Sequence, residues 1–292
     1  SPLLYGLDAI RIGRTLPRPD VISAQDPFET GLVAWWIARQ LKVPLHIQVH
    51  TDFLSPEYRK HSFINRIRII MAAFVLRHAA RVRVVSERLN TSLPTRFHLA
   101  GLITVLPIFA DLDRIRTAEV SPVLAARFSN FKTKLLVVSR LEPEKNVALA
   151  IKAFAKSAPR DACLIIIGGG SQRKALQTLA EDFDVSDRVF FEGEQDAALY
   201  YPLADLVLVP SKYEGYGLVI IEALAAGKPI LSTDVGVARE AGAIIASPEH
   251  FATALAEWFK NGPRQASLRE YPYRNFDEYV KAYCADIAAA KR

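Results

Sequence analysis

The chain has 292 residues, about twice the usual size of one domain, so two domains are expected. Half of the residues are hydrophobic and 23% are charged, and no repeat or low-complexity tract is present, which argues against a disordered or fibrous protein. The longest apolar runs, 69–76 and 206–210, are far too short to span a bilayer.

The net charge of +6 is concentrated in the first part of the chain. Residues 1–130 contain 17 Lys and Arg against 10 Asp and Glu, whereas residues 131–292 contain 20 against 21. An anionic membrane surface, an acidic acceptor or a solvated basic face would each explain this excess. No aromatic-basic motif supports a nucleic-acid partner, so none is expected. The two cysteines, Cys163 and Cys284, suggest no disulfide framework and fit a reducing, cytoplasmic compartment.

The first half predicts strands and helices in alternation. Short apolar segments predict strands over 20–23, 45–50, 82–85 and 103–106, and helical patterns cover 31–41 and 63–77. Residues 111–131 lack strand character and contain Pro122, so the link between two domains is placed there. The predicted domains are 1–120 and 121–292.

The second half alternates more regularly. Strands are predicted over 135–139, 163–168, 188–191, 206–209 and 229–232, and helices over 147–158, 172–181, 197–203 and 218–226. Continuous apolar strands that alternate with helices are typical of a parallel sheet covered on both faces. The fold class is therefore α/β, with doubly wound domains that bind ligands at the carboxyl ends of their strands.

Two carboxylates stand out near residue 220. Glu214 precedes the predicted helix and Glu222 lies within its first turns, with seven residues between them. Gly215 and Gly217 allow the backbone to approach a ligand, and carboxylates accept hydrogen bonds from sugar hydroxyls. By themselves, two glutamates at this spacing also fit a solvated helix.

A polar loop from Ser139 to Asn146 follows the first strand of the second domain. Its Arg140 and Lys145 can clamp a diphosphate, although ordinary surface charges are the alternative. The glycines at 168–170 also follow a strand, but they match neither a dinucleotide fingerprint nor a P-loop.

In the first half, His50 follows a predicted strand and is a candidate ligand group, while a structural role is the alternative. His46 is the poorer candidate because we expect it inside the strand or on its other face. Asp111 and Asp113 form an Asp-x-Asp triplet, which we interpret as structural, with no metal predicted.

Residues 61–83 contain several arginines among apolar residues: Arg66, Arg68, Arg77, Arg81 and Arg83. Two interpretations remain open. The segment is either a core-facing helix with a basic outer face, or a basic amphipathic helix that docks on anionic lipid.

The segment 210–229, PSKYEGYGLVIIEALAAGKP, resembles the Glu-x7-Glu motif of the retaining glycosyltransferases of family 4. The resemblance extends over about residues 20–283. It implies the GT-B fold of two facing Rossmann-like domains, with an N-terminal domain that lacks its first strand and glycine-rich loop, roughly seventy residues by the usual domain size.

The resemblance also implies roles for the candidate residues. Glu214, with Tyr216, Gly217 and the backbone at Leu218, would hold the donor sugar, and Glu222 the nucleotide ribose. Arg140 and Lys145 would neutralise the leaving diphosphate, Gly169 and Gly193 would line the nucleotide pocket, and His50 would reach the donor sugar.

The predicted function is hexosyl transfer from a nucleotide-diphosphate sugar to a glycan or lipid-linked acceptor, as in polysaccharide biosynthesis. We expect retention of configuration, no metal and no cofactor besides the donor substrate, with peripheral contact to an anionic membrane as an additional expectation. Two alternatives remain open: a nucleotide-sugar epimerase of the same fold, and a catalytically defective nucleotide-sugar-binding fragment.

Overall fold

The computed structural model describes residues 8, 11–13, 15, 17–97, 99 and 102–291. The chain divides into two compact units. The first contains Ser1–Phe109 and Pro272–Arg292, and the second contains Ala110–Tyr271.

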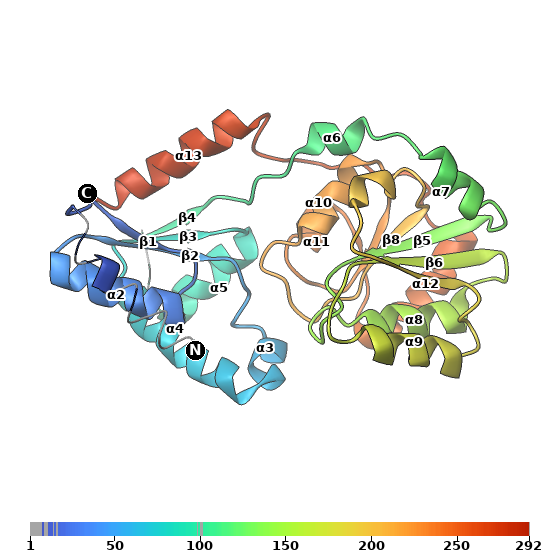
Figure 1. The fold of residues 1–292 in the computed structure, drawn as a ribbon, viewed down its shortest axis with the longest axis horizontal. Coiled ribbons are helices and arrows are strands. Elements are labelled where there is room, and N and C mark those ends of the chain that lie inside the picture. The colour runs from blue at the N-terminus through green and yellow to red at the C-terminus, as the bar shows by residue number, and fades with distance from the viewer. Residues whose placement is uncertain are drawn as a thin grey trace. The chain divides into compact units, whose positions relative to one another are not determined.

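The first unit is built on a parallel sheet of four strands in the order β1-β2-β3-β4. These strands are β1 (Ile22–Ala24), β2 (Leu45–Val49), β3 (Arg81–Val84) and β4 (Ile103–Val105). The helices are α2 (Glu29–Leu41), α3 (Pro56–His61), α4 (Phe63–Arg77), α5 (Glu87–Phe97) and α13 (Phe276–Ala289). Figure 1 shows α2, α4 and α5 on one face of this sheet and α13 on the opposite face.

Helix α13 explains why polar residues occur in a buried strand. All five residues of β2 are buried, and His46 and Gln48 are both 0% exposed. A buried polar group without a partner is costly, so each requires hydrogen bonds inside the protein. Side chains of α13 supply part of them, since Asp286 bonds His46 and Tyr283 bonds Gln48.

The second unit is built on a parallel sheet of six strands in the order β10-β9-β8-β5-β6-β7. Its strands are β5 (Thr133–Val138), β6 (Ala162–Ile167), β7 (Val189–Gly193), β8 (Leu206–Val209), β9 (Ile230–Ser232) and β10 (Ile244–Ile245). Its α-helices are α6 (Leu112–Arg116), α7 (Pro122–Arg127), α8 (Val147–Ser157), α9 (Arg173–Asp182), α10 (Leu218–Ala225), α11 (Ala238–Ala241) and α12 (Phe251–Asn261), with 3₁₀ turns η1 (Ala197–Leu199) and η2 (Pro248–His250).

The core of the second unit lies between the central strands and α8, α9 and α12. Every residue of β6 is buried, and Phe154 and Trp258 are among the largest fully buried side chains. Each such side chain contributes roughly 1.5–3 kcal/mol through removal of its apolar surface from water. Burial also raises the pKa of the Cys163 thiol to about 12, so this free cysteine is inert packing.

The fold class predicted from the sequence is confirmed, because both sheets are parallel and helices connect their strands. The division of the chain differs from the prediction in two places. The second unit begins at Ala110 rather than at 121, and residues 111–131, where the link was placed, contain the helices α6 and α7. Helix α13 belongs to the first unit, because its polar side chains satisfy those of β2 and β3.

Candidate functional site

The strand order of the second unit defines where a ligand would bind. From β5 the chain proceeds to β6 and β7 on one side, and it then returns to β8 on the other side. The boundary between β5 and β8 is therefore the switch point of this sheet, and ligands of open α/β sheets bind beyond the strand ends at such a point. The loops that follow β5 and β8 are 139–146 and 210–217, the two segments singled out from the sequence.

These two loops contact each other directly. Lys212 N donates to Glu144 O over 2.8 Å, and the Lys145 Nζ–Glu214 Oε1 distance is 2.7 Å. Ser211 Oγ donates to the same Glu214 oxygen over 2.8 Å. The side chains of Lys145 and Glu214 are 17% and 16% exposed, so the pair is largely but not wholly shielded from solvent. The structure thus brings together one predicted cation and one predicted carboxylate.

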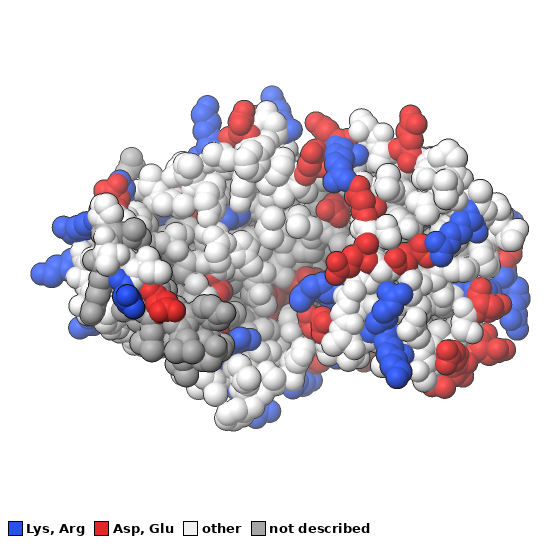
Figure 2. All heavy atoms as spheres, in the orientation of Figure 1, with Lys and Arg blue, Asp and Glu red and all other residues white. Residues whose placement is uncertain are grey.

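Arg140 lies on the same loop but has a different partner. Its Nη2 lies 3.0 Å from Glu144 Oε1, and its side chain is 70% exposed. Arg140 and Lys145, the two residues predicted to bind the diphosphate, are therefore both paired with carboxylates. Figure 2 shows acidic and basic side chains interspersed on the visible face of the second unit.

The glycines at 168–170 have a structural reason that the sequence did not reveal. Gly168 has φ +126°, and a Cβ there would lie 1.9 Å from Ser139 O. Gly170 has φ +154°, and a Cβ there would lie 2.5 Å from Leu141 O. The glycine turn thus lets the loop after β6 pack against the loop after β5 and holds Ser139 and Arg140 in place.

Gly169 and Gly193 lie at the ends of neighbouring strands. Gly168 N donates to Gly193 O over 2.7 Å, and a Cβ on Gly169 would lie 3.0 Å from Glu194 Oε1. Gly193 has φ +76° and more open surroundings. The two predicted nucleotide contacts are adjacent to each other, and among the described residues no hydrogen bond joins either of them to Glu214 or Glu222.

The backbone before α10 is shaped by two glycines. Gly217, with φ +90°, is the N-cap residue of α10, and Leu218 is the first helical residue. Gly236 must be glycine because a Cβ there would lie 2.1 Å from Tyr216 O, which also accepts from Val237 N over 2.9 Å. Tyr216 is only 5% exposed, so a ligand contact at this residue would be made through its backbone rather than through its ring.

Glu222 has a partner that sequence reasoning missed. Tyr201 is 0% exposed and donates its hydroxyl to Glu222 Oε2 over 2.8 Å. Burial raises the pKa of Glu222, although the hydrogen bond from Tyr201 opposes this shift. The pKa of Tyr201 is raised well above its ordinary value by burial and by the Glu222 charge, so the tyrosine remains a donor. Glu222 is thereby held in one orientation, in the second turn of α10.

Asp111 and Asp113 have local partners. Asp111 accepts a hydrogen bond from Arg114 N at the start of α6, and Asp113 pairs with Arg116 over 3.2 Å. Both contacts agree with the structural interpretation. Among the described residues, no group of three or more His, Cys, Asp or Glu side chains is arranged to hold a metal ion.

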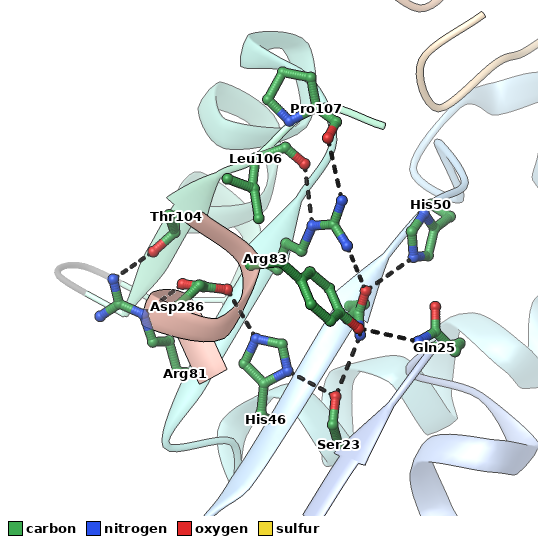
Figure 3. A network of polar contacts seen from close by, with 12 residues as sticks. Ser23, Gln25, His46, His50, Arg81, Arg83, Thr104, Leu106, Pro107 and Asp286 are labelled. Atoms are coloured by element: carbon green, nitrogen blue, oxygen red, sulfur yellow. Dashed lines mark hydrogen bonds and ion pairs between the residues drawn. The ribbon is translucent and has the colours of Figure 1, made fainter. Parts of the chain in front are cut away.

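His50 lies in the first unit, directly after β2, and its Nε2 lies 3.3 Å from Gln48 Oε1. His46 lies inside β2, as one of the two expected placements had it, and not on the other face, because residues two apart in a strand point to the same side. Figure 3 shows the resulting polar network, which also contains Ser23, Arg83 and Tyr283. The signal for it was present in the sequence as polar residues at every second position of an apolar strand.

Family models match almost the whole chain. The model described as "Glycosyl transferases group 1" matches residues 126–275, and the one described as "Glycosyl transferase 4-like domain" matches residues 2–108. The chain belongs to the group 1 glycosyltransferase family. The family predicted from the segment 210–229 is therefore confirmed.

Curated relatives carry transferase and synthase names. The chain is 26% identical over 231 residues to the alpha-monoglucosyldiacylglycerol synthase of Streptococcus pneumoniae, covering 73% of this chain and 51% of that protein. It is 29% identical over 280 residues to the 2-deoxystreptamine glucosyltransferase of Streptomyces kanamyceticus, covering 87% of this chain and 71% of that protein. The chain therefore spans about half the length of the first of these group 1 relatives.

Solved structures of this family share the fold. The sucrose-phosphate synthase of Thermosynechococcus elongatus has a TM-score of 0.77 at 22% identity, covering 97% of this chain and 74% of that chain. Anabaena HepE in complex with UDP and glucose has a TM-score of 0.70 at 23% identity, covering 88% and 72%. These similarities establish the GT-B glycosyltransferase fold for this chain. Within the part of the chain that is described, no helix is long and apolar enough to traverse a membrane.

Proposed function

We propose that the protein is a metal-independent, retaining glycosyltransferase that moves a hexosyl group from a nucleotide-diphosphate sugar to a glycan or lipid-linked acceptor. The observation that carries the proposal is the contact of Lys145 with Glu214 at the β5–β8 switch point. A cation suited to phosphate and a carboxylate suited to sugar hydroxyls lie side by side where α/β sheets bind nucleotides. Family membership and the UDP and glucose bound by HepE support the same assignment.

Donor binding would give Lys145 and Glu214 new partners. The diphosphate takes Lys145 and Arg140 from their carboxylates, and a sugar hydroxyl donates to the Glu214 oxygen that Lys145 has left. The cost of separating the ion pair is offset by the new contacts. Because Lys145 and Glu214 already lie together at the switch point, both groups are in position before the donor arrives. Tyr201 holds Glu222 in the orientation in which its second oxygen accepts from the ribose.

In the transfer step, the bond between the anomeric carbon and the diphosphate oxygen breaks while the acceptor oxygen bonds that carbon on the same face. The acceptor proton passes to the departing diphosphate, and the configuration is retained. Lys145 and Arg140 stabilise the negative charge that develops on the leaving diphosphate, which is the role that a metal ion fills in other transferases.

A thermal-shift panel of nucleoside diphosphates and their sugars tests the proposal. At a ligand concentration 100 times the dissociation constant, the native state gains about 2.7 kcal/mol, and a chelator should leave the shift unchanged. Glu222→Ala should reduce the shift caused by the nucleoside diphosphate. Glu214→Gln should preserve or enlarge that shift, because Lys145 loses its competing partner, and should abolish transfer.

Product analysis separates the alternatives. An altered sugar nucleotide formed without acceptor would indicate an epimerase. Binding of a nucleoside diphosphate with neither transfer nor donor hydrolysis would indicate a non-catalytic binding protein. Equal loss of binding and transfer in Glu214→Gln and Glu222→Ala would contradict the division of roles between the two carboxylates.

A surface of the first unit supports an acceptor held in an anionic membrane. The outer face of α4 exposes five large apolar residues in a stripe: Phe63 (72%), Ile64 (56%), Ile67 (44%), Ile70 (71%) and Phe74 (39%). Beside it is a cavity of about 1250 Å³ whose charged lining residues are all cationic: Arg59, Lys60, Arg66 and Arg96. Apolar side chains beside a basic hollow are suited to acyl chains and anionic lipid headgroups, at about 1 kcal/mol per cation near such a surface.

Vesicle sedimentation tests this membrane contact. The protein should bind phosphatidylglycerol vesicles and not phosphatidylcholine vesicles, less strongly as salt rises, and Ile70→Glu should weaken binding severalfold. Val123→Glu is the matched control, because Val123 is 76% exposed on α7 of the second unit. Equal binding to both vesicles would contradict the proposal, and a dimer that Ile70→Glu dissociates would assign this surface to a second copy of the chain.

A further inference from the structure

Gln48 is the first group that constrains His50. It lies two residues earlier on the same face of β2, it is 0% exposed, and its Oε1 lies 3.3 Å from His50 Nε2. Arg83 on β3 points to the same oxygen, with Nη1 at 2.7 Å (Figure 3). One buried amide oxygen therefore faces both side chains.

The orientation of the Gln48 amide is fixed by chemistry. A guanidinium has five N–H donors and no acceptor, so the atom that faces Arg83 is the amide oxygen. The amide nitrogen then lies on the other side, where it donates to Tyr283 Oη over 2.5 Å and to Ser23 Oγ over 3.2 Å. All of these partners lie on secondary structure of the first unit.

The amide orientation in turn decides which nitrogen of His50 carries the proton. Since Gln48 Oε1 only accepts, the His50 Nε2 atom beside it is the donor. In a neutral imidazole the other nitrogen, Nδ1, then has a free lone pair. In the part of the chain that the structure describes, Nδ1 has no hydrogen bond to the protein.

The surroundings of His50 also favour its neutral form. Burial, followed by the positive charge of Arg83, lowers the pKa of His50 to about 4, and Asp26 opposes the shift. Arg83 is 2% exposed and is anchored by Leu106 O at 3.0 Å and Pro107 O at 3.2 Å. Its guanidinium also lies 4.8 Å from the ring centroid of Tyr283 on α13. The charge that acts on His50 is thus fixed in position.

We propose that Gln48 and Arg83 are positioning residues that hold His50 as a neutral imidazole protonated on Nε2 and thereby leave Nδ1 as a hydrogen-bond acceptor. A ligand group that binds Nδ1 must donate a hydrogen. This part of the inference rests on the proposed function, in which the substrates carry sugar hydroxyls that can donate. A substrate with fluorine in place of the hydroxyl that binds Nδ1 loses the contact, because fluorine cannot donate a hydrogen bond.

Nitrogen NMR of the ligand-free protein tests the proposal without any nucleotide sugar. With ¹⁵N-labelled histidine, and with the His50 signals assigned from a His50→Gln variant, His50 should be protonated on Nε2 and should stay neutral at pH 5.5. Arg83→Met should raise its titration midpoint by about one unit, because it removes the buried positive charge. Gln48→Glu, which keeps the acceptor for both neighbours, should raise the midpoint further by stabilising the imidazolium.

Arg81→Met is the matched control. Arg81 lies on the same strand but bonds Asp286 and Thr104 rather than Gln48, so His50 should titrate as in the unaltered protein. An Nδ1-protonated His50, a wild-type midpoint near 6.5, or equal shifts in the two arginine variants would overturn the proposal. None of these results depends on transfer activity, so a failure here is distinguishable from a failure of the proposed function.

Discussion

Single residues near the switch point are constrained for different reasons. Lys145 and Glu214 pair with each other, and their proposed ligand roles require that pair to open. Gly168 allows the loop after β6 to approach the loop after β5 closely, and this requirement does not depend on a ligand. A substitution therefore has to be interpreted through the contact that it removes.

Gly168→Ala should destabilise the second unit. The new Cβ would lie 1.9 Å from Ser139 O at a φ that side chains rarely adopt, and strain of this kind costs about 1–3 kcal/mol before any clash is added. Gly193→Ala is the matched control, because its φ is also positive but the nearest neighbour of a Cβ is a side-chain nitrogen of Arg173 at 3.7 Å. Urea unfolding of both variants measures the difference, and an equal or smaller loss in Gly168→Ala would contradict this account.

At the scale of elements, α13 is attached to the first sheet by a buried carboxylate. Asp286 is 4% exposed and bonds His46 and Arg81 over 2.9 and 2.7 Å. Although burial raises the pKa of Asp286, the hydrogen bonds from His46, Arg81 and Thr104 prevail and lower it to about 2. The Asp286 carboxylate therefore stabilises the folded state at every pH at which it is ionised.

Asp286→Asn should cost about 3 kcal/mol at neutral pH, since breaking a buried pair leaves the other charge uncompensated. Folding lowers the pKa of Asp286 from 3.8 to about 2. The difference in unfolding free energy between variant and wild type should therefore have its full size above pH 3.8 and vanish as the pH falls through 2. Hydrogen exchange of α13 at several pH values measures this difference. The exposed Asp277→Asn on the same helix should cost only about 0.5 kcal/mol, and equal effects of the two variants would refute the role of Asp286.

Elements with strong local patterns were predictable from the sequence. The strand 206–209 and the helix 63–77 were predicted with the bounds that β8 and α4 have. In α4, Ser62 Oγ accepts from Asn65 N and marks the helix start. Helix α5 was missed because Pro94 interrupts its pattern, and α13 was missed because its one buried residue is the polar Asp286.

Within the candidate site, residue types and spacing were sufficient to locate the two loops. The contact of Lys145 with Glu214 joins positions 69 residues apart, and that of Tyr201 with Glu222 depends on side-chain directions, so neither follows from local pattern. The Gln48–Arg83 contact likewise requires the register of β2 against β3, in which Gln48 is opposite Arg83. These contacts could not be predicted because the local sequence pattern does not show which residues far apart in the chain lie next to each other.

At the scale of the whole molecule, the second unit has a core of its own. Its buried cluster extends from Leu135 to Trp258 and uses no residue of the first unit. We therefore expect residues 110–271 alone to fold cooperatively, and to show the same nucleoside-diphosphate shift as the full chain if the proposed site is correct. Calorimetry of this fragment with and without ligand is the measurement, and a fragment without a cooperative transition would contradict the division.

The first unit, in contrast, is assembled from two separated stretches, with the second unit inserted between them. During translation, β2 and β3 leave the ribosome long before α13, so His46, Gln48 and Arg83 lack their helical partners while more than a hundred further residues are made. Domains fold as units while they are synthesised. The inserted second unit can therefore complete its folding first, and the sheet of the first unit, although made earlier, is completed last. We therefore expect the face of the first sheet that α13 covers to stay open to solvent until that helix has been synthesised.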